Sequence, residues 1–183
     1  IPLGYSGRAI LIIHDLAVYK YPELFPDKLI DFDRRIVVPR SIRKADRIIA
    51  VSGSTKVDII ELFGVSDEKV KVIYEGVEGH DAVEAKSAED YFLFIGTIEP
   101  RKNLEFLIRA YTKFVQATDW PGELRLAGGR GWKNEGVFTA MTEANNELGR
   151  EAVKYLGYID ETQKSELYQS ATAFVFPSLY EGF

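Results

Sequence analysis

The sequence contains no cysteine among its 183 residues. That absence excludes disulfide bonds, thiolate nucleophiles and zinc sites built on sulfur ligands. Only His14 and His80 could supply an imidazole ligand, and neither a His-Glu-x-x-His nor an EF-hand spacing occurs. We therefore expect no metal held by the protein's own side chains, and the lack of cysteine is typical of a cytoplasmic protein.

Long apolar runs and an excess of positive charge are also missing. No stretch approaches the roughly 20 apolar residues that span a bilayer, and the N-terminus lacks a basic-then-apolar secretion signal. With 23 Lys and Arg against 28 Asp and Glu, the formal charge of -5 argues against broad binding to nucleic acid, which depends on phosphate neutralisation. We therefore expect no nucleic-acid partner.

One basic stretch stands apart from this acidic background. Arg34 to Arg47 carries six Lys and Arg residues and one acid, with apolar residues interleaved. Such a helix could contact an anionic membrane peripherally. An ordinary surface helix that packs one face on the sheet is the favoured explanation, and Pro39 would disturb a helix interior.

The remaining composition, 46% hydrophobic and 28% charged, is that of a globular protein with a core. Short apolar runs alternate with amphipathic stretches, which indicates an α/β fold with parallel sheets. Expected strands are Ala9–Ile13, Arg47–Val51, Val70–Ile73, Tyr91–Ile95, Glu123–Ala127, Val153–Leu156 and Ala173–Phe176, the first two being buried. Expected helices are Leu29–Lys44, Thr55–Phe63, Leu104–Ala117, Val137–Leu148 and Thr162–Ser170, with Gly64 ending the second.

The chain divides into two α/β domains. Residues 75–90 are polar, acidic and poor in large apolar side chains, so we interpret them as a linker between domains at 1–74 and 91–183. The first strand begins within a few residues of Ile1 and the chain ends in a loop at Phe183. We therefore expect a fragment in which both domains are incomplete.

Ligands of parallel sheets bind in the loops after the strands, at their carboxyl ends. The most informative such loop is Gly96–Asn103, which contains Thr97, Arg101 and Lys102 and precedes a helix. A helix N-terminus and two cations suit a diphosphate. A solvated turn with two surface cations is an equally good explanation of these residues alone.

Three more loops of the second domain occupy equivalent positions. Gly128 and Gly129 follow one strand and would let a base or a phosphate approach, while Gly157 and Tyr158 follow the next. Glu181 lies beyond the last strand, where a carboxylate in a cleft could accept hydrogen bonds from sugar hydroxyls. A plain turn explains the glycine loops at least as well, and from the residues alone it is the favoured explanation for Glu181.

In the first domain, His14 and Asp15 follow the first strand, which makes the imidazole a candidate for proton transfer. Neighbours on a strand point to opposite faces, so the two side chains need not touch. Ser52 and Ser54 follow the second strand. Ser54 is the simpler candidate for a helix N-cap, which leaves Ser52 as the better ligand.

Taken in order, the segments IIHDLAVYKYPELFP, ADRIIAVSGSTKVDI, VIYEGVE, FLFIGTIEPRKNLEFLIRAY, LRLAGG, VKYLGYI and LYQSATAFVFPSLYEGF resemble glycosyltransferase family four. The resemblance implies a GT-B fold of two Rossmann-like domains that face each other across the active-site cleft. The second domain would bind a nucleotide-sugar donor and the first would be the later half of the acceptor domain.

The resemblance also implies roles for single residues. Arg101 and Lys102 would hold the donor diphosphate, and His14 would lie close to the transferred sugar. Glu181 matches the first carboxylate of the family's Glu-x7-Glu motif, expected against the donor sugar. Further donor contacts are expected at Gly96, Thr97, Gly128, Gly129, Gly157, Tyr158, Ile159, Ser52, Gly182 and Phe183. Thr97 departs from the family, many members of which carry Arg there, so Arg101 would supply the second positive charge.

The implied reaction is transfer of a hexose with retained anomeric configuration to a polysaccharide or lipid-linked acceptor, with no cofactor and no metal. The segment GTIEPRKN is similar to mannosyltransferases of bacterial polysaccharide assembly, which favours GDP-mannose as donor. Alternatives are a GT-B-type epimerase or phosphorylase and a non-catalytic module that binds nucleotide sugars. A dinucleotide oxidoreductase is disfavoured because the GxGxxG loop is missing.

Overall fold

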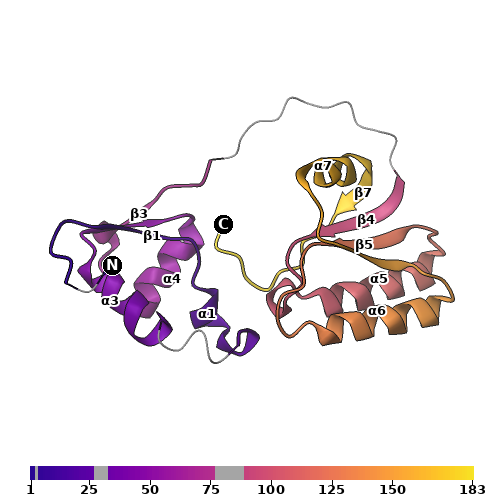
Figure 1. Cartoon of the computed structure of the whole chain (residues 1–183), viewed down its shortest axis with the longest axis horizontal. Helices are drawn as coiled ribbons and strands as arrows, with labels where there is room; N and C mark the ends of the chain where they lie inside the picture. The colour runs from indigo at the N-terminus through magenta and orange to yellow at the C-terminus, as the bar shows by residue number, and fades with distance from the viewer. Residues whose placement is uncertain (3, 27–32, 77–88) are drawn as a thin grey trace. The chain divides into compact units, whose positions relative to one another are not determined.

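A computed structural model describes residues 1–2, 4–26, 33–76 and 89–183. By its packing the chain forms two compact units (Figure 1), one comprising Ile1–Gly79 with Tyr180–Phe183 and the other His80–Leu179. Most of the predicted linker, residues 77–88, lies outside the described residues. The last four residues differ from the predicted domain boundary, since they pack with the first unit rather than with residues 91–179.

The first unit contains a parallel sheet of three strands in the order β1-β2-β3. Its strands are β1 (Ile10–Ile13), β2 (Arg47–Ala50) and β3 (Val70–Val72). Its helical elements are α1 (Ala17–Lys20), η1 (Pro22–Leu24), η2 (Asp33–Val37), α3 (Val38–Lys44), α4 (Gly53–Phe63) and η3 (Asp67–Lys69). As predicted, Gly64 is the left-handed C-cap of α4.

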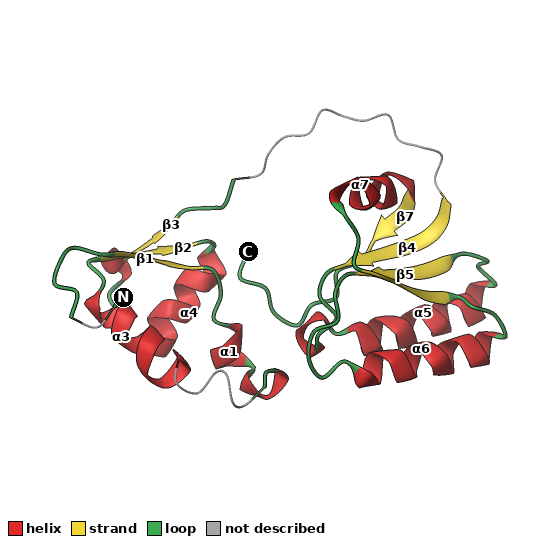
Figure 2. Cartoon of the chain, viewed as in Figure 1, coloured by secondary structure: helices red, strands yellow, loops and turns green. Residues whose placement is uncertain are grey.

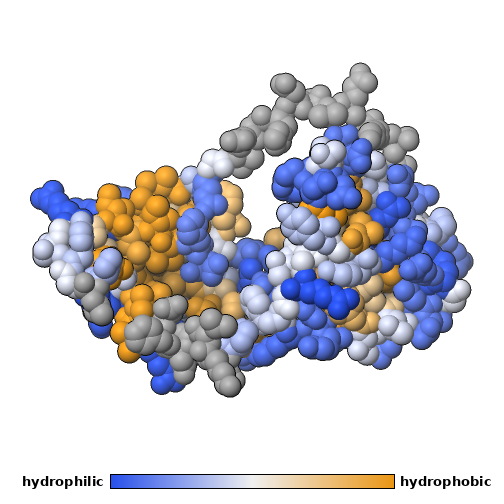
Figure 3. Space-filling view, in the orientation of Figure 1, coloured by the Kyte–Doolittle hydropathy of each residue, from blue (hydrophilic) through white to orange (hydrophobic). Residues whose placement is uncertain are grey.

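The core of this unit lies on one face of the sheet. Ile48, Ile59 and Val70 are fully buried there, together with Ile42 from α3. On β1, Ile10 and Ile12 are 67% and 53% exposed because alternate side chains of a strand point to opposite faces. The expectation that this strand is buried was therefore wrong for Ile10 and Ile12. Figure 3 shows apolar residues gathered over this unit.

The second unit contains a parallel sheet of four strands in the order β6-β5-β4-β7. Helices α5 and α6 lie side by side along one face and α7 covers the other (Figure 2). The strands are β4 (Glu89–Ile95), β5 (Glu123–Ala127), β6 (Val153–Gly157) and β7 (Ala171–Phe174). The helices are η4 (Pro100–Lys102), α5 (Leu104–Thr118), α6 (Glu135–Leu148) and α7 (Glu161–Ser170).

The sequence pattern of α5 explains how this core assembles. Its buried residues Leu104, Leu107, Ile108, Tyr111 and Val115 recur at helical spacing and form one apolar face. That face packs with the sheet, in which Leu93 and Phe94 of β4 and Leu124 and Leu126 of β5 are fully buried. Strand β7 begins and ends two residues before the predicted strand. Phe176 therefore lies in the loop that follows β7.

The basic stretch forms η2 and α3 rather than one regular helix. Pro39 lies in the first turn of α3, where its missing N–H is not needed. The predicted helix began at Leu29, and residues 27–32 lie outside the described residues. Among the described residues, no helix is both long and apolar enough to cross a bilayer.

Candidate functional site

Three predicted loops of the second unit meet at the carboxyl edge of its sheet. The amide of Gly96 donates to Ala127 O at 2.9 Å, and that of Gly128 donates to Gly157 O at 2.7 Å. The amide of Ile98 donates to Gly129 O at 2.9 Å. The structure thus brings Gly96, Gly128, Gly129 and Gly157 side by side, in strand-end loops far apart in the sequence.

Gly128 is required by this arrangement. Its φ of 136° is one that side-chain-bearing residues rarely adopt, and a Cβ there would overlap the carbonyl of Gly96. A Cβ at Gly129 would meet nothing within 4 Å. The first glycine is therefore needed to bring the loops together, and the second leaves open space beside them.

Arg101 is paired with an acid that the sequence analysis did not single out. Its Nε and Nη2 lie 3.1 and 2.8 Å from Glu99 Oε1, and Glu99 is only 4% exposed. The pair fixes the orientation of the guanidinium and offsets the cost of burying the carboxylate. The sequence suggested a loop with two uncompensated positive charges. In the structure the charge of Arg101 is balanced by Glu99.

Lys102 is also more enclosed than predicted. It is 8% exposed, and its Nζ lies 4.7 Å from the centre of the Phe176 ring. Both basic residues belong to the short helix η4, and Asn103 separates it from α5 with a left-handed φ of 55°. The loop after β7 joins this group, because the Leu179 amide donates to Arg101 O at 2.9 Å.

The remaining predicted residues of this unit differ in their surroundings. Thr97 is exposed and Tyr158 is 84% exposed. Ile159 is partly buried and lines a hollow of about 440 Å³ beside α7, together with Tyr91 and Arg125. Gly96, Gly128 and Gly129 do not line this hollow.

In the first unit, His14 contacts a carboxylate distant in sequence. His14 Nδ1 lies 2.6 Å from Glu75 Oε1, and both side chains are well exposed. Asp15 instead accepts a hydrogen bond from the amide of Ala17 at 3.0 Å, at the start of α1. A carboxylate against Nδ1 fixes the orientation of the imidazole ring.

Ser52, which we expected to be available to a ligand, makes hydrogen bonds within the protein. Its Oγ accepts from the Thr55 amide at 3.1 Å, so Ser52 rather than Ser54 is the N-cap of α4. The same hydroxyl donates to the carbonyl of Gly182, as does Thr55 Oγ1 at 2.8 Å. Ser52 thus binds the C-terminal tail, residues 180–183.

The tail makes a second contact through Tyr180. Its hydroxyl donates to Asp58 Oδ2 at 2.7 Å, and Lys20 Nζ lies 2.6 Å from Asp58 Oδ1. Burial and the bond to Asp58 raise the pKa of Tyr180, while the bond to Asp58 and its charge raise the pKa of Lys20. Both groups therefore keep their protons at neutral pH.

Two further predicted residues lie on the same tail. Glu181 is partly buried between Tyr180 and Gly182. Phe183 is 61% exposed, and its ring centre lies 6.4 Å from that of Tyr74. The structure therefore places Glu181, Gly182 and Phe183 in one unit with His14 and Ser52.

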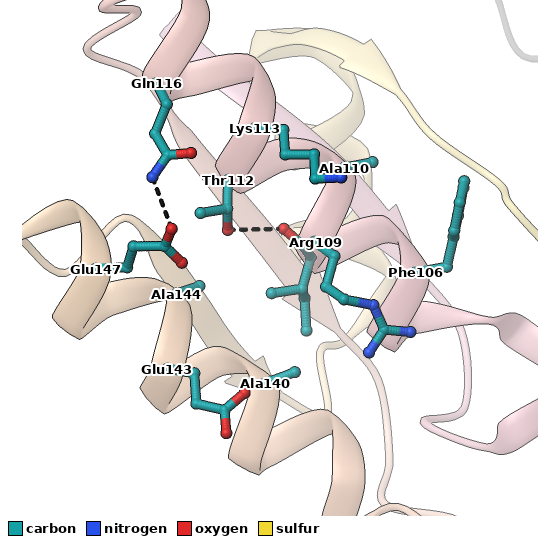
Figure 4. Close-up of a pocket in the computed structure, with 11 residues that line it drawn as sticks. Phe106, Arg109, Ala110, Thr112, Lys113, Gln116, Ala140, Glu143, Ala144 and Glu147 are labelled. Carbon is teal, nitrogen blue, oxygen red and sulfur yellow. Dashed lines mark hydrogen bonds between the residues drawn. The ribbon is translucent and has the colours of Figure 1, made fainter.

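A further hollow lies away from these loops, between α5 and α6 (Figure 4). It has a volume of about 660 Å³, and Arg109 and Lys113 of α5 lie across it from Glu143 and Glu147 of α6. None of the predicted site residues lines it. Two packed helices with charged outer faces account for this groove.

Three acids at these sites were given no role from the sequence: Glu75, Glu99 and Asp58. Glu75 is 61 residues from His14, so no local pattern reveals the pair. Glu99 lies two residues before Arg101 in the same loop. Asp58 follows Ser52 and Thr55 at intervals of three, a helical spacing that could have revealed their common face.

Comparison with known families accounts for both units. The family described as glycosyl transferases group 1 matches residues 78–183, and glycosyltransferase family 4 matches residues 3–79. The chain belongs to the group 1 glycosyltransferases. The loops at the edge of the second sheet lie within the matched region of that family.

Two curated proteins and one solved structure illustrate the similarity. O-antigen chain mannosyltransferase B of Escherichia coli is 31% identical over 96% of this chain and 48% of its own length. O-antigen chain mannosyltransferase RfbU of Salmonella typhimurium is 28% identical over 94% of this chain and 46% of its own length. The chain thus spans about half the length of the curated relatives it matches.

The solved structure is sucrose-phosphate synthase of Thermosynechococcus elongatus. It matches with a TM-score of 0.72 and 21% identity, over 98% of this chain and 47% of its own. At 21% identity the match is evidence for a shared fold alone. The two parallel-sheet units of this group 1 glycosyltransferase therefore have the GT-B-type fold predicted from the sequence.

Proposed function

We propose that this chain carries the loops of a retaining glycosyltransferase that moves a hexose from a nucleotide sugar to a polysaccharide or lipid-linked acceptor. The observation that carries the proposal is the meeting of Gly96, Gly128 and Gly157 beside the Arg101–Lys102 turn at one sheet edge. Mannose, carried by GDP, is the proposed sugar. Two relatives named as O-antigen mannosyltransferases support it.

The donor diphosphate would bind at the turn that contains Arg101 and Lys102. Their charges stabilise the negative charge that develops as the diphosphate leaves, and Glu99 holds Arg101 in place before the donor arrives. The open space at Gly129 and the exposed Tyr158 would receive the nucleotide base. No side chain of these loops needs to act as a nucleophile.

The transferred sugar would be contacted by His14 and Glu181. In a front-face reaction the acceptor hydroxyl attacks the anomeric carbon from the side that the diphosphate leaves, and its proton passes to a leaving-group oxygen. The configuration is then retained, and no metal is required. His14, oriented by Glu75, would lie against the transferred sugar, and the Glu181 carboxylate would accept hydrogen bonds from its hydroxyls.

The proposal includes a cytoplasmic location, where the absence of cysteine is ordinary. The basic residues of α3, Arg40, Arg43 and Lys44, are the proposed point of peripheral contact with an anionic membrane. Co-sedimentation with vesicles rich in anionic lipid tests this part. An Arg43→Gln/Lys44→Gln variant that sediments as well as the parent protein would contradict it.

The proposed donor site is tested by the thermal stability of the chain against GDP-, UDP- and ADP-sugars. We expect one nucleotide class to raise the unfolding temperature and Arg101→Ala/Lys102→Ala to abolish the rise. The matched control is Arg109→Ala/Lys113→Ala, which removes two cations from α5 outside the proposed site. A rise that survives in the first variant and disappears in the control would place the donor elsewhere.

A further inference from the structure

Asp58 is a buried carboxylate to which the proposed reaction assigns no role. It is 5% exposed on α4, and each of its oxygens has a partner. Oδ1 lies 2.6 Å from Lys20 Nζ at the end of α1, and Oδ2 accepts from the Tyr180 hydroxyl at 2.7 Å. Because a buried carboxylate is costly unless paired, this arrangement strongly favours one position of the Tyr180 side chain.

A second anchor holds the tail two residues later. The carbonyl of Gly182 accepts hydrogen bonds from the hydroxyls of Ser52 and Thr55. Ser52, Thr55 and Asp58 follow one another at intervals of three, so both anchors lie on one face of α4.

Gly182 also allows the closest approach in the tail. A Cβ at this position would overlap the carbonyl oxygen of His14 and would lie 2.7 Å from the Cβ of Asp15. A side chain at position 182 would therefore push the tail off the loop that carries His14.

Glu181 lies between these two anchors. With the side chain of Tyr180 bonded on one side and the carbonyl of Gly182 bonded on the other, the backbone at Glu181 has little freedom. We propose that Lys20, Asp58 and Tyr180 are positioning residues that fix the Glu181 carboxylate for the hydroxyls of the transferred hexose. This inference rests on the proposed function.

The physical reason for such a device is the sensitivity of hydrogen bonds to position. A carboxylate contributes to recognition of a sugar only when its oxygens lie within about 3 Å of the hydroxyls. A displacement of about 1 Å by a change far from the chemistry can cost roughly 100-fold in rate. Burial and Asp58 raise the pKa of Tyr180, so its hydroxyl remains a donor across the neutral range.

The test compares the dissociation constants of GDP-mannose and of GDP for the full-length protein, or of UDP-glucose and UDP if that pair binds. The ratio of the two constants reports the contact with the sugar. We expect Glu181→Gln to reduce the preference for the sugar-bearing ligand about tenfold, the scale of one charge-assisted hydrogen bond. Tyr180→Phe should reduce it comparably and leave the constant for the bare nucleotide within about twofold.

A double variant distinguishes a purely structural role of Tyr180 from an effect that acts through Glu181. If Tyr180 acts through Glu181, Tyr180→Phe has no further effect on the ratio in a Glu181→Gln background. Asp58→Asn provides a second way to break the contact, should Tyr180→Phe fold poorly. The matched control is Tyr168→Phe on α7, whose ring packs against Phe174.

The outcomes distinguish the two proposals. If Glu181→Gln lowers the preference for the sugar-bearing ligand and neither Tyr180→Phe nor Asp58→Asn does, the positioning inference is wrong and the proposed function stands. Equal losses for nucleotide and nucleotide sugar in Tyr180→Phe also overturn the inference, because they show a general disturbance. If the protein binds no nucleotide sugar, the proposed function itself fails.

Discussion

At the scale of single residues, two of the basic groups at the sites, Arg101 and His14, are each paired with an acid. Arg101 is held by Glu99 and His14 by Glu75. In each pair the contact orients the basic side chain, and under the proposed function it places a negative charge next to the incoming diphosphate or sugar hydroxyl. The residue types and their strand-end positions could be predicted from the sequence. The partners could not, because Glu75 reaches His14 only through the fold.

The close approach of Gly96 and Gly128 gives a prediction for a single residue. Gly128→Ala should lower the free energy of unfolding by about 3 kcal/mol, since it combines an unfavourable φ with a clash against a backbone carbonyl. Gly129→Ala is the matched control and should change it by less than about 0.5 kcal/mol. Chemical denaturation measures both. Equal effects of the two variants would contradict the geometry given for these loops.

At the scale of elements, the sequence predicts most strands and helices of the second unit. Strand β5 has the predicted bounds, and α5 and α6 differ from prediction by no more than two residues at either end. The prediction for β7 lies two residues too late in the sequence. The apolar pattern continues through Val175 and Phe176, although the last residue of β7 paired with β4 is Phe174. The pattern of apolar residues in a sequence does not show where pairing with the adjacent strand ends.

A network of charges across strands adds a prediction at this scale. Glu123 of β5 lies 2.6 Å from Lys154 on β6 and 2.9 Å from Arg125, which also reaches Glu89 on β4 at 3.0 Å. Burial favours neutral Glu123, but the hydrogen bonds from Lys154 and Arg125 outweigh it and lower its pKa.

Because this pKa is lower in the folded state, the network stabilises the unit fully above the unfolded-state pKa of about 4.3 and loses that contribution as pH falls through the folded value. The unfolding temperature should therefore drop with acidification in this range, and less steeply for Glu123→Gln. Circular dichroism of both proteins from pH 6 to pH 3 measures the difference. Identical slopes would exclude a role for Glu123 in the acid response.

At the scale of the whole molecule, the described residues form two separate hydrophobic cores. One gathers around Leu124 and Leu126 of β5 and the other around Ile48 of β2. The division into two α/β domains could be predicted from the sequence because a polar acidic segment interrupts the apolar pattern. The return of residues 180–183 to the first unit could not, since it depends on contacts of Tyr180 and Gly182 with a helix more than 100 residues away.

Two cores predict two unfolding steps. Leu126→Ala and Ile48→Ala each remove a fully buried side chain and should each cost about 3 kcal/mol, but in different steps. Differential scanning calorimetry of the two variants tests this. A single transition lowered equally by both substitutions would show that the units unfold together.

The central claim is that the strand-end loops of the second unit bind a nucleotide sugar. The most direct test is the shift of backbone amide resonances of the isotope-labelled chain on addition of GDP-mannose, with UDP-glucose in parallel. We predict that the shifts gather at Gly96–Asn103, Gly128–Gly131 and Gly157–Ile159. Shifts that gather instead in the groove between α5 and α6, or no shifts with either ligand, would contradict the claim.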